Sequence, residues 1–131
     1  MKKYIGIFIL LFLVTPFNSL ASDFRYEKDY WVKGMGQRFP EGFCNKSKIF
    51  MACFDVTYEE CSAEILESYN LCASKLDSEI PAIIDSRDLS EKLGNKLGSC
   101  TGSTYNTKMV PKFKKSSECE RIMNEIKSSM K

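Results

Sequence analysis

The chain has 131 residues, with 19 basic and 17 acidic side chains and a formal net charge of +2. It contains no histidine, which excludes a His-ligated zinc site, a Cys-x-x-Cys-His haem site and any Ser-His or Cys-His nucleophile pair. The length is sufficient for one domain with a modest hydrophobic core.

Residues 1–21 have the three parts of a secretory signal peptide. Lys2 and Lys3 precede an apolar run, and Ser19 and Ala21 supply the small side chains that signal peptidase requires. The apolar run is shorter than the roughly 20 residues that span a bilayer. We therefore expect this segment to be cleaved rather than kept as a membrane anchor.

The mature chain, residues 22–131, is expected to form a single domain in the periplasm or the medium, with no transmembrane segment. Loss of Lys2 and Lys3 with the signal peptide leaves 17 basic and 17 acidic residues. This neutral balance gives no support to a nucleic-acid partner.

Residues 22–44 are rich in aromatic side chains and are interrupted by glycine and proline. Because they show no sustained helical period, we expect an irregular aromatic arm that lies over the rest of the domain and fills gaps in its core. The alternative is a partner-binding surface. Tyr30 and Trp31 would then be the contacts, since Trp and Tyr dominate interface hot spots.

The middle of the chain predicts a short helical segment followed by a long helix. Residues 47–53 are long enough for one or two helical turns. Thr57 and Glu60 form a capping box, which predicts a helix start, and the helix should run to about residue 76. Apolar residues then recur every three or four positions and form one buried stripe: Cys61, Ile65, Tyr69, Cys72 and Leu76.

A second long helix is predicted after Pro81, opened by Ser86 or Asp88. Four residues should point inward: Leu89, Leu93, Leu97 and Cys100. The same helix has a glycine at every fourth position: Gly94, Gly98 and Gly102. We expect these glycines to allow tight packing against the first long helix, with a groove for a partner segment as the alternative.

Residues 105–116 are expected to form a loop that is rich in lysine. Lys112, Lys114 and Lys115 are the candidate contacts for a partner, although such a run is often only solvated. A last helix, capped by Ser116 or Ser117, should bring four residues inward: Cys119, Ile122, Met123 and Ile126.

The chain has six cysteines, an even number in an exported protein, which predicts three disulfides. They are Cys44, Cys53, Cys61, Cys72, Cys100 and Cys119. No two have the Cys-x-x-Cys spacing of a redox motif or a zinc ribbon. Cys61 and Cys72 lie about 16 Å apart along one helix, which exceeds the ~4.4 to 6.8 Å that a disulfide allows. An antiparallel arrangement of the two long helices favours Cys61 with Cys100, and leaves Cys72 to pair with Cys44, Cys53 or Cys119.

Residues 43–105 resemble a group of short exported bacterial proteins of unassigned function. The resemblance is carried by the pattern Cys-Phe-Asp-Val-Thr-x-Glu-Glu-Cys over residues 53–61, by an Ile-Pro pair, and by Gly94, Gly98 and Cys100. It implies no activity. In general plan, the chain is also similar to periplasmic immunity proteins that neutralise the toxins of rival bacteria.

The predicted fold is mainly α, a small bundle of three to four helices stapled by three disulfides, with an irregular aromatic N-terminal arm. The predicted function is protein binding in the cell envelope or outside, as an inhibitor or immunity protein. A structural or envelope-maintenance protein is the alternative. A small hydrolase that uses Glu60, Glu64 or Glu67 ranks third, because no apolar pocket is evident around these carboxylates. We expect no enzyme activity, no metal and no cofactor.

Overall fold

A computed structural model describes residues 23–131, and the predicted signal peptide and its cleavage site lie outside this range. The described chain is mainly helical and contains five α-helices, together with short π and 3-10 turns and one pair of two-residue strands. This confirms the predicted fold class, although we expected three or four helices. No helix within residues 23–131 combines the length and the hydrophobicity needed to cross a membrane.

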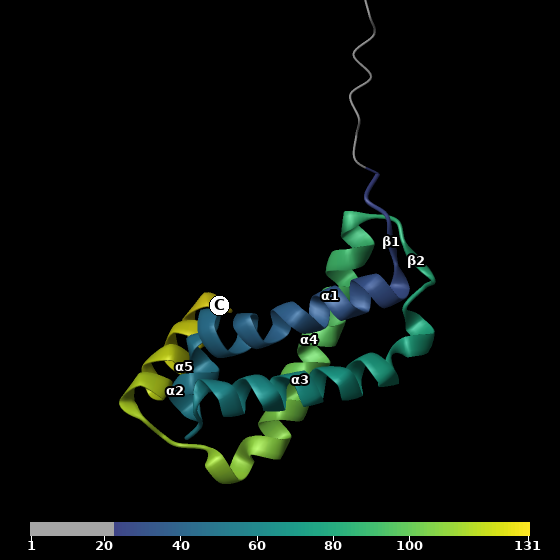
Figure 1. Ribbon diagram of the computed structural model, residues 1–131. Helices are drawn as coiled ribbons and strands as arrows, with labels where there is room; N and C mark the ends of the chain where they lie inside the picture. Colours follow the sequence, from purple (N-terminus) through teal and green to yellow (C-terminus); the bar gives the residue numbers. More distant parts are fainter. Residues whose placement is uncertain (1–22) are drawn as a thin grey trace, which may run out of the picture.

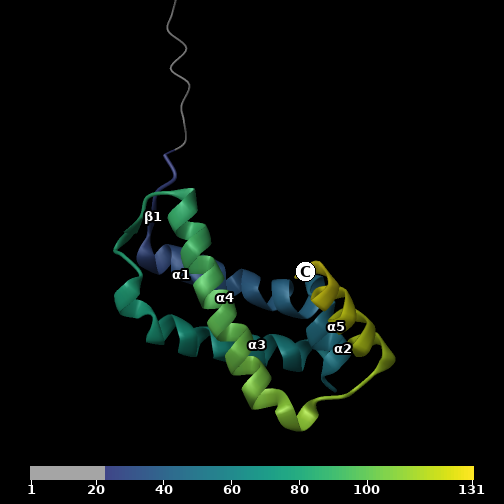
Figure 2. The ribbon, with the colours of Figure 1, turned by 180° about the vertical axis from the view of Figure 1, so that it is seen from behind.

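The long helices form two layers (Figure 1). Helices α1 (Lys28–Glu41) and α3 (Tyr58–Lys75) lie side by side and run in opposite directions, and α4 (Arg87–Met109) crosses them on the face that Figure 2 brings to the front. Helices α2 (Lys48–Cys53) and α5 (Ser117–Ser129) pack against each other at one end of the molecule.

Short elements connect these helices. The strands β1 (Tyr26–Glu27) and β2 (Ile83–Ile84) form an antiparallel pair next to the start of α1. A π-helical turn, η1 (Gly42–Lys46), joins α1 to α2, and 3-10 turns follow α3 and α4 as η2 (Asp77–Glu79) and η3 (Val110–Lys112).

The predicted helix starts are confirmed. The Thr57 hydroxyl accepts a hydrogen bond from the Glu60 amide, and the Glu60 carboxylate accepts one from the Thr57 amide, which completes the capping box. Ser86 caps α4 and Ser116 caps α5 in the same manner, each accepting from the amide three residues later. Local side-chain chemistry therefore sets where these helices begin.

The expected irregular arm is wrong, because most of residues 22–44 belong to α1 and η1. Trp31 and Phe39 are buried against the rest of the domain, so tertiary packing outweighs the low helix propensity of the glycines. Gly36 serves a close approach: a Cβ atom there would lie 2.8 Å from the ring of Tyr69.

The expected loop over residues 105–116 is also partly wrong, because α4 continues to Met109. The buried face of α4 repeats every four residues, through Leu93, Leu97, Thr101, Tyr105 and Met109. Thr101 interrupts the apolar pattern, but its hydroxyl donates to the Leu97 carbonyl at 2.7 Å, which satisfies it inside the core.

Three disulfides join the helices, and they pair Cys44 with Cys61, Cys53 with Cys119, and Cys72 with Cys100. Exclusion of the Cys61–Cys72 pair is confirmed, whereas the favoured Cys61–Cys100 pair is wrong. Residues 77–86 contain a 3-10 turn and a strand rather than one tight turn, and α4 crosses α3 instead of running along it. The crossing therefore places Cys100 level with Cys72.

Helix α5 differs from the prediction in its burial. Cys119 is buried, but Met123 and Ile126 are each 40% exposed although we expected both to point inward. The reason is that α5 packs mainly against the short helix α2, which is too small to cover its whole apolar face.

Candidate functional site

The two aromatic candidates have opposite environments. Trp31 is only 5% exposed, and its indole N–H donates to the Ser90 hydroxyl at 2.8 Å. It is a core residue and offers no ring to a partner, which corrects its assignment as a contact. Tyr30 is 70% exposed and stacks on Tyr26, with ring centroids 6.0 Å apart.

Two of the three glycines on the face of α4 contact side chains from the first part of the chain. A Cβ atom at Gly94 would lie 3.1 Å from the end of Met35, and one at Gly102 would lie 3.2 Å from the ring of Phe43. Gly98 has no neighbour within 4 Å of such an atom. Close packing is therefore the role of Gly94 and Gly102, but the neighbours are α1 and η1 rather than α3.

Two of the three lysines predicted to contact a partner already form ion pairs within the domain. Lys112 forms an ion pair with Glu60 at 3.2 Å, and Lys115 forms one with Glu120 at 3.2 Å. Lys114 makes no ion pair within residues 23–131. Its backbone N–H donates to the Cys53 carbonyl at 2.8 Å.

The carboxylates considered for hydrolysis face lysines of α4 and η3. The ammonium group of Lys108 lies 2.6 Å from Glu64 and 2.8 Å from Glu67, and these contacts raise the pKa of Lys108. The pKa of Glu60 is lowered, first by the hydrogen bond from the Thr57 amide and then by Lys112. A general acid requires the opposite shift of its pKa.

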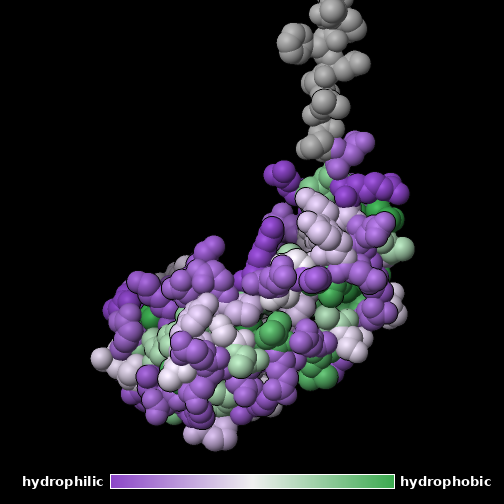
Figure 3. Space-filling view, viewed as in Figure 1, coloured by the Kyte–Doolittle hydropathy of each residue, from purple (hydrophilic) through white to green (hydrophobic). Residues whose placement is uncertain are grey.

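A groove of about 920 Å³ lies between α1 and α3. Its walls mix apolar and charged residues, and the Lys28–Asp77 ion pair, 2.7 Å long, belongs to its lining. In Figure 3 the hydrophobic residues on this face appear as separate areas among hydrophilic ones. The Tyr69 hydroxyl in the groove donates to the Val32 carbonyl at 2.6 Å, which leaves it less available to a ligand.

A second hollow, of about 500 Å³, lies between α2, the end of α4, η3 and α5, and we call it the apolar hollow. Its lining is apolar except for one side chain and consists of Ile49, Phe50, Cys53, Phe54, Asn106, Val110, Phe113 and Met123. Val110 and Phe113 are 65% and 55% exposed, respectively. Large apolar side chains exposed together are characteristic of interaction sites.

Backbone pairing holds Phe113 at the edge of the hollow. The Asp55 amide donates to the Lys112 carbonyl, and the Lys114 amide donates to the Cys53 carbonyl, both at 2.8 Å. These bonds form an isolated antiparallel bridge between Phe54 and Phe113, whose rings meet edge to face with centroids 5.8 Å apart. Phe113 is thus fixed in place although it is exposed.

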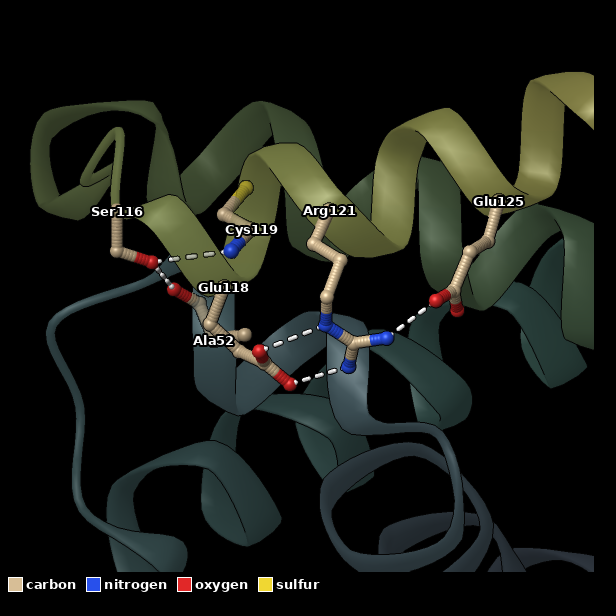
Figure 4. A network of polar contacts seen from close by, with 6 residues as sticks. All are labelled: Ala52, Ser116, Glu118, Cys119, Arg121 and Glu125. Atoms are coloured by element: carbon tan, nitrogen blue, oxygen red, sulfur yellow. Dashed lines mark hydrogen bonds and ion pairs between the residues drawn. The ribbon is translucent and has the colours of Figure 1, made fainter.

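Helix α5 is fixed beside the hollow mainly at its first turn (Figure 4). The Ser116 hydroxyl donates to the Ala52 carbonyl at 2.9 Å and accepts from the Cys119 amide, and Cys119 is bonded to Cys53 in α2. Farther along, Arg121 pairs with Glu118 and Glu125, both on α5 itself.

The apolar hollow was not predicted from the sequence, although three residues predicted as partner contacts are close to it in the chain: Lys112, Lys114 and Lys115. Phe113 lies between these lysines, and Met123 was assigned to the core. The exposed pair Tyr26 and Tyr30 is a separate surface, near the first turn of α1, whereas α2 and α5 lie beyond the other end of that helix. One signal in the sequence could have indicated the hollow. The apolar face of residues 117–129 is broader than a single short helix can cover.

A protein-family model described as T2SS substrate NttA matches residues 25–113. The match contains five of the six cysteines and all elements from β1 to η3, and it includes the shorter region over residues 43–105 that resembles exported bacterial proteins. Helix α5 and Cys119 lie beyond it. Comparisons with curated proteins and with solved structures gave no match.

Proposed function

The chain belongs to the family of NttA, a substrate of the type II secretion system, and we propose from this premise that it works outside the cell by binding a protein partner. A substrate of this system passes through the periplasm and is secreted, so the chain is an exported protein. The predicted signal peptide over residues 1–21 and the three disulfides agree with that route.

The apolar hollow is the observation that supports protein binding most directly. It places Val110, Phe113 and Met123 at the surface around an apolar interior. Exposing such side chains to water is unfavourable, by about 25 cal/mol for each Å² of apolar surface. Covering them by a partner would recover that free energy, which is the usual source of affinity at the centre of an interface.

Secretion also bears on the kind of partner. An immunity protein of the periplasmic type acts inside the producing cell, whereas a secreted protein meets targets outside it. We therefore favour a binding protein, including an inhibitor, whose target is extracellular. The structural envelope role and the hydrolase role remain alternatives, with no observation at the hollow that favours either.

Site-specific cross-linking tests the proposal. A photo-reactive phenylalanine analogue replaces Phe113 in the oxidised mature protein, which is incubated with envelope and secreted fractions and irradiated. We expect one partner to be cross-linked from position 113, because this side chain lies at the mouth of the hollow.

The same analogue in place of Leu71 is the matched control, since Leu71 is also apolar and 47% exposed but lies on α3. Identical cross-linked proteins from positions 113 and 71, or from the reduced and alkylated protein, would contradict a specific site at the hollow. The absence of any cross-linked protein from position 113 would favour the envelope role.

A further inference from the structure

The chemistry around the apolar hollow indicates what kind of partner segment it accepts, and this inference rests on the proposed function. Another hollow, of about 470 Å³, adjoins it, and the two share Phe113 and Met123 in their linings. The adjoining hollow is also lined by Lys115, Glu120 and Lys127. An apolar surface therefore continues directly into a charged one.

On the α5 side of the mouth, the lining of the adjoining hollow has two lysines and one acid, so its charge is positive on balance. On α5, Glu118 and Glu125 are engaged by Arg121, and Glu120 by Lys115. In the described part of the chain, Lys127 has no ion pair. On the other side of Phe113, Lys114 has none within residues 23–131 either, but Asp55 lies beside it and is also unpaired in this range, so only the α5 side carries an uncompensated cation. On the α5 side, an arriving carboxylate would meet the ammonium group of Lys127, which has no ion pair in the described chain, whereas an arriving cation would meet Glu120, which is already paired with Lys115.

The hollow also offers one group for a peptide backbone. Asn106, the single polar residue of the lining, is exposed and makes no side-chain hydrogen bond within residues 23–131. Its side-chain amide can donate a hydrogen bond to the carbonyl of a peptide unit and accept one from the N–H. An apolar interior, a free amide and neighbouring cations together suit a peptide better than a plain hydrocarbon.

We propose that the apolar hollow binds an acidic peptide segment of the partner protein. One large apolar side chain enters between Phe54, Val110 and Phe113, and a carboxylate within the next few residues pairs with Lys127. The apolar contact supplies most of the affinity. The ion pair is exposed, so it contributes mainly to selection among sequences and to the rate of association.

Selection from a phage-displayed library of random peptides tests this proposal, with the oxidised mature protein as bait. We expect the enriched peptides to combine an aromatic or large aliphatic residue with nearby Asp or Glu. Their affinity, measured by fluorescence anisotropy, should fall as salt is added, because salt screens exposed charges.

Four variants sharpen the test. Phe113→Ser and Met123→Ser should each weaken peptide binding by about tenfold or more, as expected for contacts at an interface centre. Two such variants are used so that the test still stands if one of them fails to fold. Lys127→Glu should weaken it several-fold. Lys92→Glu is the matched charge control, because Lys92 is exposed on α4 and lies outside both linings, and it should leave affinity unchanged.

The possible failures are distinguishable. If the enriched peptides lack acidic residues and no longer bind the Phe113→Ser variant, the proposal of an acidic segment is wrong, but the proposal of a protein-binding hollow stands. Peptides that bind Phe113→Ser and Met123→Ser as well as the original chain, or no enrichment at all, would overturn both. Binding to vesicles of phosphatidylglycerol, or self-association in sedimentation, that disappears with Phe113→Ser would assign the hollow to a membrane or to a second copy instead.

Discussion

The body of the molecule, formed by α1, α3 and α4, differs from the end formed by α2 and α5 in how completely its apolar residues are covered. In the body, Ile65, Cys72 and Tyr105 have no measurable exposure. On α5 only Cys119 is buried, and Met123 and Ile126 remain at the surface. Both regions are helical and disulfide-bonded, so neither feature by itself guarantees a closed core.

The difference follows from the size of the packing partners. In the body, α3 packs against both α1 and α4, and each of these helices has at least 14 residues, so that their apolar stripes cover one another. Helix α5 has 13 residues but packs on α2, which has 6. One disulfide and one capping serine hold its first turn, and the rest of its apolar face is left for solvent or for a partner.

The largest contrast is expected between two isoleucines. Ile65→Ala in α3 removes a fully buried side chain and should lower the free energy of unfolding by about 2 to 5 kcal/mol. Ile126→Ala in α5 should change it by no more than about 0.5 kcal/mol, as at other surface positions. Urea denaturation of both variants measures the two values, and similar losses would mean that α5 belongs to the same core as α3.

Removal of one disulfide should affect the two regions to different extents. Replacing Cys53 and Cys119 by alanine removes a link between positions 66 residues apart and should lower stability by about 2 to 4 kcal/mol. We expect amide hydrogen exchange to rise mainly in α5, because the helices of the body keep their own contacts. A matching rise throughout α3 and α4 would show that the C-terminal helix supports the body.

High pH should destabilise the body through two buried tyrosines. Burial is the main cause that raises the pKa of Tyr69 and of Tyr105 from 10.0 to about 12. Their protonated forms therefore favour the folded state, and this contribution is complete below pH 10.0 and is lost as pH rises toward about 12.

Thermal unfolding across this range measures the effect. Replacing both Tyr69 and Tyr105 by phenylalanine should flatten the dependence on pH, whereas Tyr30→Phe, at an exposed position, should not. An unchanged slope in the double variant would assign the loss of stability to other groups, such as Lys108, whose pKa is also raised, first by its contact with Glu64.

The smallest expected effects distinguish the same two tyrosines from each other. Tyr69→Phe removes the hydrogen bond to the Val32 carbonyl and should cost about 0.5 to 1.5 kcal/mol. The Tyr105 hydroxyl is buried without a hydrogen-bond partner in the described chain, so Tyr105→Phe should be neutral or slightly stabilising. Urea denaturation resolves the two, and an equal loss in both would indicate a bound water at Tyr105.

Much of the fold and part of the candidate site were predictable. The helix starts at Thr57, Ser86 and Ser116 could be predicted, because each capping hydrogen bond joins residues only three positions apart in the sequence. The lysines at positions 112, 114 and 115, predicted as partner contacts, lie on either side of Phe113 in the chain, so the prediction stays open but concerns the region of the apolar hollow. Phe113 between them was overlooked, since its exposure depends on a backbone pairing with residues 53–55 that no local pattern reveals.

The sequence by itself determined the helical class, the starts of three long or amphipathic helices, the buried stripe of α3, the formation of disulfides and the impossibility of the Cys61–Cys72 pair. These depend on spacing and on contacts between near neighbours. Tertiary structure alone decided the helical state of α1, the burial of Trp31, the disulfide partners and the apolar hollow. Each of these depends on the angle and level at which distant helices meet, and packing between whole surfaces sets that geometry.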